Sequence, residues 1–265
     1  MWSSDLRAAS RCRSAGPRGP LGEGLRGTVL IRPKPRRRPI ARRLLRGIVV
    51  VVLVFVAASA GTVLLFKVVD PPFTSVMLLE PGPVGQLEFE WVGRDRIALT
   101  AARAVMASED QRFLAHRGID FVSLDRALED YRGGGGLRGA STITQQVAKN
   151  LFLWQGRSFA RKAVEAYFAI LIELCWTKER ILEVYLNVAE LGPGVFGVEA
   201  ASRRYFGTDA ASLDVSEAAL LAAVLPNPKV LNAARPTAYV RERQAEIESQ
   251  MRLLDSRGHY VGIDW

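Results

Sequence analysis

The chain has 265 residues, of which 36 are Lys or Arg and 27 are Asp or Glu, and its formal charge is +9. The first 46 residues hold 13 Lys and Arg against two acids, a balance of +11, so the remaining residues carry −2. The near-neutral remainder argues against nucleic-acid binding by the main part of the chain. The length suffices for one large domain with appendages.

The N-terminal part has the pattern of a membrane anchor. Residues 1–43 are rich in Arg, Gly, Pro and Ser and are predicted to form a disordered basic tail. Residues 48–66 are 19 uncharged residues, and with their apolar neighbours they predict a transmembrane helix over residues 44–69. Arginines flank the start of the run, so the positive-inside rule places the tail in the cytoplasm and residues 70–265 outside.

Two other interpretations of the apolar run have to be weighed. A cleaved signal peptide also follows a basic start, but this run is longer and lies deeper in the chain than is typical of one. A buried core helix is disfavoured because the run is apolar on all faces. The two cysteines, Cys12 and Cys175, lie on opposite sides of the run and have no C-x-x-C spacing, so they give no metal or redox signal.

The rest of the chain is predicted to be mostly α-helical, with few strand signals and no repeat. Residues 74–91 fit either a short strand or an amphipathic segment. Polar caps and apolar periodicity predict helices over about residues 96–108, 142–153, 159–176, 178–189, 198–206, 218–225 and 237–256, with a shorter one at 122–131. The expected starts are a capping box of Thr142 with Gln145, and caps at Ser158, Thr177 and Ser216. Glycines 133–136 predict a mobile loop, and whether it closes on a substrate stays open.

Two adjacent carboxylates, Glu109 and Asp110, end the first of these helices. The negative end of a helix dipole disfavours anionic side chains, so this placement is expected to raise a carboxyl pKa, as suits a general acid or base. The plain alternative is a solvated acidic turn.

Three further polar clusters follow. The first is a helix start with Ser141, Gln145, Gln146, Lys149 and Asn150, which fits an anion cradle or an ordinary exposed polar face. In the second cluster Arg161 and Glu165 are four residues apart, as in a common surface ion pair. The third cluster is R-I-L-E-V-Y-L-N, where Glu183 and Asn187 could bond within a helix whose apolar residues form a core stripe.

The clusters contain four motifs in a fixed order: E-D-x-x-F-x-x-H-x-G-x-D, G-x-S-T-I-T-Q-Q-x-x-K-N, R-K-x-x-E and R-I-L-E-x-Y-L-N. Together they resemble the signature of the peptidoglycan glycosyltransferases of family 51. The chain ends at Trp265 without a following acyl-transferase domain, so the resemblance is to the monofunctional branch. It covers roughly residue 72 to the C-terminus and leaves the basic tail unexplained.

The resemblance implies a mostly α, lysozyme-like glycosyltransferase domain after one N-terminal transmembrane helix. It implies that lipid II is polymerised into β-1,4-linked strands with release of undecaprenyl pyrophosphate. Glu109 would be the general base and Glu165 the second essential carboxylate. Lys149 and Arg161 would neutralise the pyrophosphate. The remaining matched residues would line or hold the cleft: Ser141, Gln145, Gln146 and Asn150.

The resemblance also bears on cofactors, partners and location. No cofactor is required, and a divalent cation, Mg²⁺ or Mn²⁺, at the pyrophosphate stays open. The expected partners are lipid II, the growing strand, the membrane and cell-wall or cell-division proteins, and no nucleic acid. The expected location is the bacterial inner membrane, with a single span and a periplasmic catalytic domain. The alternatives are a lysozyme-like lytic enzyme, which would need no cationic cradle, and a catalytically inactive cell-division scaffold.

Overall fold

The computed structural model describes residues 38–79, 87–135, 141–154, 156, 158–263 and 265. The predicted tail up to residue 37 and Gly136 of the predicted loop lie outside the described residues. The elements, in chain order, are α1 (Arg38–Val68), α2 (Ser75–Leu79), β1 (Glu88–Phe89), η2 (Arg94–Arg96), α3 (Leu99–Glu109), η3 (Phe113–Ala115), α4 (Phe121–Arg132), α5 (Ile143–Phe152), α6 (Phe159–Cys175), α7 (Lys178–Val188), β2 (Glu190–Gly192), β3 (Val195–Phe196), α8 (Val198–Phe206), η4 (Ala210–Ser212), α9 (Val215–Val224) and α10 (Ala238–Ser256). The chain is mostly α-helical, as predicted.

Helix α1 begins before the predicted boundary between tail and membrane helix. Residues 38–43, assigned above to the tail, are already helical. Pro39 is tolerated there because an amide in the first helical turn has no partner within the helix. The stretch Ile40–Val68 is long and apolar enough to cross a membrane, and no other helix in the described ranges is.

Residues 51–265 form a compact unit of their own, which includes the second half of α1 and the site described below. The end of α1 is held in this unit by side chains that bind its backbone carbonyls. The Trp176 indole donates to the Val63 carbonyl at 2.7 Å, and the Arg180 guanidinium donates to the Phe66 carbonyl at 2.9 Å. The last turns of α1 are therefore fixed to α6 and α7.

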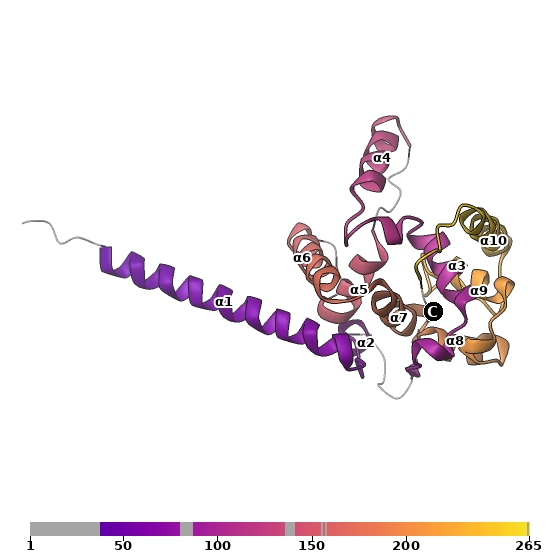
Figure 1. The fold of residues 1–265 in the computed structure, drawn as a ribbon, viewed down its shortest axis with the longest axis horizontal. Coiled ribbons are helices and arrows are strands. Elements are labelled where there is room, and N and C mark those ends of the chain that lie inside the picture. The colour runs from indigo at the N-terminus through magenta and orange to yellow at the C-terminus, as the bar shows by residue number, and fades with distance from the viewer. Residues whose placement is uncertain (1–37, 80–86, 136–140, 155, 157, 264) are drawn as a thin grey trace, which may run out of the picture. The chain divides into compact units, whose positions relative to one another are not determined.

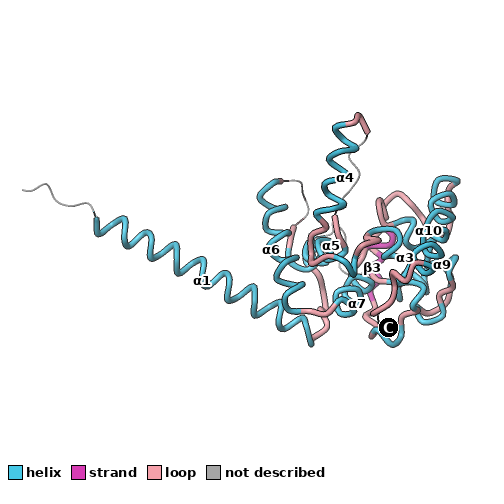
Figure 2. The backbone as a smooth tube through the Cα atoms, turned by 45° about the horizontal axis from the view of Figure 1, so that its top comes forward, coloured by secondary structure: helices cyan, strands magenta, loops and turns pink. Residues whose placement is uncertain are grey.

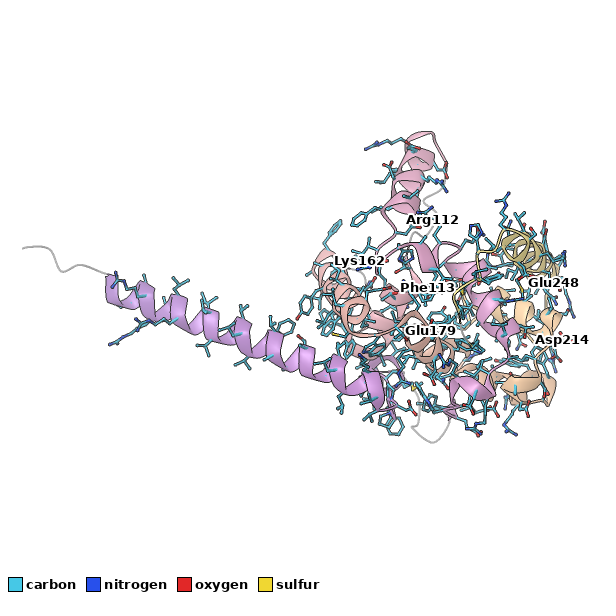
Figure 3. All side chains as sticks on the ribbon, viewed as in Figure 1. Arg112, Phe113, Lys162, Glu179, Asp214 and Glu248 are labelled. Atoms are coloured by element: carbon cyan, nitrogen blue, oxygen red, sulfur yellow. The ribbon has the colours of Figure 1, made fainter. Side chains whose placement is uncertain are left out.

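The helix starts follow the predicted caps with one exception. Thr142 and Gln145 form the expected capping box of α5, and Ser158 and Thr177 cap α6 and α7. The predicted cap at Ser216 is wrong, because α9 begins at Val215 under a capping box that Asp214, labelled in Figure 3, forms with Glu217. An aspartate at the N-cap can accept the same amide bond as serine, so the helix extends to the earlier residue.

The core is built around α7. Helix α5 packs on α6 and α7, while α9 packs on α3 and α10, and α7 lies between these two groups in both views (Figures 1 and 2). Seven of the eleven residues of α7 are buried, and so are Ala218–Val224 of α9. The apolar stripe predicted on α7 is thus a core stripe.

A small sheet closes one side of this unit. β1 pairs in parallel with β3, which pairs antiparallel with β2. Each strand has only two or three residues, which is why periodicity gave no strand signal. The undecided segment 74–91 contains both the short helix α2 and the strand β1. In contrast, α4 extends away from the other helices and buries only Ala127 (Figure 1).

Candidate active site

Glu109 is the last residue of α3, and its neighbour Asp110 explains why the helix ends there. The Asp110 carboxylate accepts a hydrogen bond from the Ile143 amide at 3.1 Å and one from His116 Nε2 at 2.9 Å. Asp110 therefore ties the end of α3 to the first residue of α5. Its side chain faces inward, and that of Glu109, which is 16 % exposed, faces the site.

Asp120 holds the start of the next helix, α4. Its carboxylate accepts hydrogen bonds from the Val122 and Ser123 amides and so caps α4, and it forms an ion pair with Arg112 at 3.1 Å. Burial by itself would raise the pKa of Asp120, but the bonds from Ser123 and the Arg112 charge lower it overall. Asp110, His116 and Asp120 therefore shape and hold the turn between α3 and α4.

The carboxylate of Glu109 faces side chains from three other helices. Gln146 Nε2 on α5 donates to Glu109 Oε2 at 2.9 Å, and Tyr185 on α7 donates to Gln146 Oε1 at 3.2 Å. On the other side, Arg243 Nη2 on α10 lies 3.9 Å from Glu109 Oε1. The base candidate is thus enclosed, while one oxygen is left without a hydrogen bond from the described residues.

The pKa of Glu109 is raised above its ordinary value, and burial is the largest cause. The hydrogen bond from Gln146 and the charges of Arg243 and Lys149 oppose the rise, and the Asp110 charge adds to it. The direction agrees with the sequence-based expectation, but the main cause is desolvation rather than the helix end. A raised pKa suits a group that must accept a proton near neutral pH.

A cavity of about 310 Å³ opens beside Gln146. Its polar and charged lining comprises Gln146, Lys149, Asn150, Arg161, Tyr185, Glu190 and Lys229. Val76, Trp154 and Phe196 supply an apolar part of the wall. The cavity therefore combines cationic groups with apolar surface, as suits a ligand that is anionic and partly apolar.

Lys149 is the cation of this cavity whose surroundings most clearly favour an anionic ligand. Burial lowers its pKa, while the charges of Glu165 and Glu109 act in the opposite direction. Among the described residues, none forms a hydrogen bond or ion pair with its ammonium group. An unpaired lysine in a partly buried position is costly unless a ligand supplies the counter-charge, so its ammonium is positioned for an anion.

Glu165, which is 3 % exposed, holds the other cations in place. Its carboxylate accepts a bond from Arg161 Nη1 at 2.8 Å and one from Lys162 Nζ. Lys162 also donates to Ser141 Oγ at 3.1 Å and is labelled on α6 in Figure 3. Arg161 and Glu165 therefore do not form an ordinary surface ion pair. The Glu165 carboxylate is buried and fixes Arg161, which lines the cavity.

Glu165→Gln is expected to lower both stability and turnover, because the amide leaves Arg161 and Lys162 without a counter-charge. Breaking a buried ion pair costs about 3–5 kcal/mol, and we expect the lower part of that range because Lys162 is 45 % exposed. Thermal unfolding and turnover, measured on the same preparation, check this. Wild-type stability would show that Glu165 does not hold the two cations.

The start of α5 differs from the predicted anion cradle. Its Ile143 amide is occupied by Asp110, and its Gln145 amide by the Thr142 hydroxyl. Gln145 is buried in the capping box, so its role is structural. Asn150 lines the cavity and donates to the Val188 carbonyl at 3.5 Å. The Lys149 ammonium, rather than the helix amides, is therefore available to an anion.

A second cavity, of about 250 Å³, adjoins Glu109. Ser141, Arg112 and Arg126 also line it. Glu109 lines this cavity and its partner Gln146 lines the first, so the pair separates the two spaces. The separation suits a base between two substrates.

Sequence reasoning missed several residues of this region. Tyr185 was assigned to the core stripe alone, and Lys229, Arg126 and Arg243 were not singled out. Arg243 lies on a polar helix 134 residues after Glu109, and no local pattern distinguishes it from surface arginines. Asn187, considered above as a partner of Glu183, donates to the Glu183 and Val92 carbonyls and so holds the chain before α3.

Comparison with known proteins gives a consistent result. A sequence model of the family described as Transglycosylase matches residues 80–252. A protein of Xanthomonas campestris pv. campestris (strain B100) named "Biosynthetic peptidoglycan transglycosylase" is 47% identical over 233 residues, 85% of this chain and 94% of that protein. Relatives of the same name are 49% identical in Pseudomonas fluorescens (strain SBW25), over 84% of this chain and 95% of theirs, and 53% identical in Marinomonas sp. (strain MWYL1), over 72% and 83%.

Proposed function

The chain belongs to the transglycosylase family, and we infer from this membership that it is a peptidoglycan glycosyltransferase. Its mostly helical domain is the lysozyme-like domain of that family. Its substrates are lipid II and the growing glycan strand. The observation that carries the mechanism below is the placement of Glu109 and the unpaired Lys149 at two neighbouring cavities, on either side of Gln146.

In the proposed reaction Glu109 is the general base. The acceptor sugar, lipid II, approaches from the second cavity, and Glu109 takes the proton of its 4-hydroxyl. The hydroxyl oxygen attacks C1 of the donor strand, the bond from C1 to the pyrophosphate oxygen breaks, and inversion gives the β-1,4 link. The raised pKa of Glu109 supports this role, because a stronger base accepts the proton more readily.

The first cavity is proposed to hold the donor's pyrophosphate. Lys149 and Arg161 neutralise the charge that develops as the leaving group departs, and fixed cations in a partly desolvated site are effective at this. Glu165 supports them by holding Arg161, and Ser141 is tied to the same group through Lys162. Gln146 orients the base, while Gln145 and Asn150 hold α5 in position.

This arrangement is proposed to work without a resident metal ion. Two fixed cations supply the charge that Mg²⁺ or Mn²⁺ would otherwise give the pyrophosphate, and an added cation would bind through the substrate. Purified enzyme dialysed against EDTA is therefore expected to keep at least half of its turnover on lipid II. A loss of more than tenfold that Mg²⁺ or Mn²⁺ restores would show that a metal ion is required.

We propose that α1 anchors the enzyme in the bacterial inner membrane with a single span. The basic flank at its start favours a cytoplasmic N-terminus and a periplasmic catalytic domain. Both substrates are lipid-linked, so an anchor keeps the site at the surface where they lie. Cell-wall and cell-division proteins remain proposed partners, and the near-neutral catalytic domain does not favour nucleic acid.

The function is tested by offering the purified enzyme lipid II and, separately, finished glycan strands. Polymer from lipid II together with intact finished strands is the expected result. Cleavage of strands without polymer formation would instead support the lytic enzyme, and inactivity on both substrates would support the scaffold. The cationic cavity favours polymerisation, because hydrolysis of finished strands releases no pyrophosphate.

A further inference from the structure

We propose that Tyr185 is a positioning residue for the base, because its hydroxyl fixes the orientation of the Gln146 amide that faces Glu109. The inference rests on the proposed role of Glu109 as general base. Tyr185 is 1 % exposed and belongs to the wall of the first cavity, and its hydroxyl bonds to Gln146. It is proposed to act only through Gln146.

The three side chains form a hydrogen-bonded chain across three helices. The Tyr185 hydroxyl donates to Gln146 Oε1 at 3.2 Å, and Gln146 Nε2 donates to Glu109 Oε2 at 2.9 Å. Both ends are anchored, since Tyr185 is 1 % exposed within the core and Asp110 ties the end of α3 to α5. The distances between the three groups are therefore set by helix packing.

The donor-to-acceptor direction of these two hydrogen bonds is linked to the protonation of Glu109. In the observed direction the amide NH₂ group faces the carboxylate, which suits the ionised base. If the amide turned over, its oxygen would face Glu109, which would then need a proton. The Tyr185 hydroxyl would become the acceptor, and its own hydrogen would have no partner among the described residues. An unsatisfied buried donor is unfavourable, so Tyr185 favours the direction that keeps Glu109 ionised.

Tyr185 can act as a donor throughout the working pH range. Burial raises the pKa of its hydroxyl well above the ordinary value, and the charges of Glu109 and Asp110 raise it further. The other charged groups near Glu109 are Arg243 on α10, Lys149 on α5 and the neighbouring Asp110. Removing the Tyr185 hydroxyl leaves those three charges in place, so its effect on the base can be separated from theirs.

The test is the pH dependence of kcat on lipid II for Tyr185→Phe. Without the hydroxyl the amide has no preferred direction, its bond to Glu109 weakens, and the pKa of the base rises. We expect the acid limb of the profile to move up by about one pH unit, which is about a tenfold loss below the limb. Above the limb the variant should approach the wild-type rate, and KM should change little.

Tyr260→Phe is the matched control. It also removes one hydroxyl from a buried tyrosine, whose bond goes to the Arg103 carbonyl at 3.3 Å, away from Glu109. Its pH profile should equal that of the wild type. If Tyr185→Phe loses activity equally at every pH, or keeps the wild-type limb, Tyr185 merely fills the core and the inference is wrong.

A double-mutant cycle keeps the inference testable if Tyr185→Phe folds poorly. Gln146→Leu should move the acid limb in the same direction, and Tyr185→Phe in that background should move it no further. Additive shifts would overturn the inference.

Glu109→Gln distinguishes a failure of the proposed base from a failure of the role of Tyr185. An active Glu109→Gln enzyme rejects Glu109 as the base. If Glu109→Gln is inactive and the acid limb of Tyr185→Phe stays at the wild-type pH, only the role of Tyr185 is rejected.

Discussion

Glu109→Gln is expected to abolish polymerisation of lipid II while leaving the fold intact. The amide keeps the shape of the side chain but cannot accept the proton of the acceptor hydroxyl. Loss of a general base lowers turnover by about 10²–10⁴-fold. The measurement is the rate of lipid II consumption, followed together with the glycan products.

The stability of the same variant follows from the sign of the pKa shift. The pKa of Glu109 is raised in the folded state, so its contribution to stability is present at low pH and is lost as the pH rises through the folded pKa. At neutral pH the charged side chain therefore destabilises the fold, and a neutral amide relieves this. Tm should equal or exceed that of the wild type, which separates catalytic loss from unfolding.

Glu248→Gln on α10 is a suitable control for this substitution (Figure 3). It makes the same chemical change at a residue whose carboxylate lies 3.9 Å from Arg252 and lines neither cavity. Its turnover should match that of the wild type. A residual rate above a tenth of wild type in Glu109→Gln would place the base elsewhere.

Lys149→Met is expected to lower kcat/KM on lipid II by about 10²–10³-fold, the range found when one preorganised electrostatic group is removed. Met preserves the length and the apolar stem of lysine but leaves the leaving pyrophosphate with one cation fewer. Steady-state kinetics at several lipid II concentrations measures the loss.

This loss should come without a loss of stability. Burial lowers the pKa of Lys149, so below that pKa the folded state carries a charge that it disfavours. Met removes the charge, and Tm is expected to stay equal or rise. Such a residue is retained for function at the expense of stability. Wild-type turnover in Lys149→Met would refute the cradle assignment.

Lys178→Met provides the contrasting control. Burial lowers the pKa of Lys178 too, but its ammonium pairs with Glu173 at 2.8 Å and lies over the Phe113 ring. Removing it leaves the Glu173 carboxylate without a counter-charge and with only the Thr144 hydroxyl as a hydrogen-bond donor, so Tm should fall. Activity per folded molecule should change little, because Lys178 lines neither cavity. Opposite outcomes for the two lysines would distinguish a functional cation from a structural one.

The sequence by itself determined the features that depend on neighbouring residues. Caps at Thr142, Ser158 and Thr177 set helix starts, because the bonds that satisfy a helix terminus come from residues within one turn. The four motifs placed Glu109, Lys149, Arg161 and Glu165 in one family signature. The same local rules failed at α9, where two polar residues two positions apart, Asp214 and Ser216, compete to start one helix.

Only the tertiary structure decided which groups meet and how deeply they are buried. β1 pairs with a segment more than a hundred residues away, and Arg243 reaches Glu109 from α10. The raised pKa of Glu109, the lowered pKa of Lys149 and the link from Tyr185 through Gln146 all depend on packing between α3, α5, α7 and α10. Desolvation is a property of the assembled core, and no local pattern of residues encodes it. The motifs therefore pointed to Glu109 as the proposed base, while the fold set the proton affinity of its carboxylate.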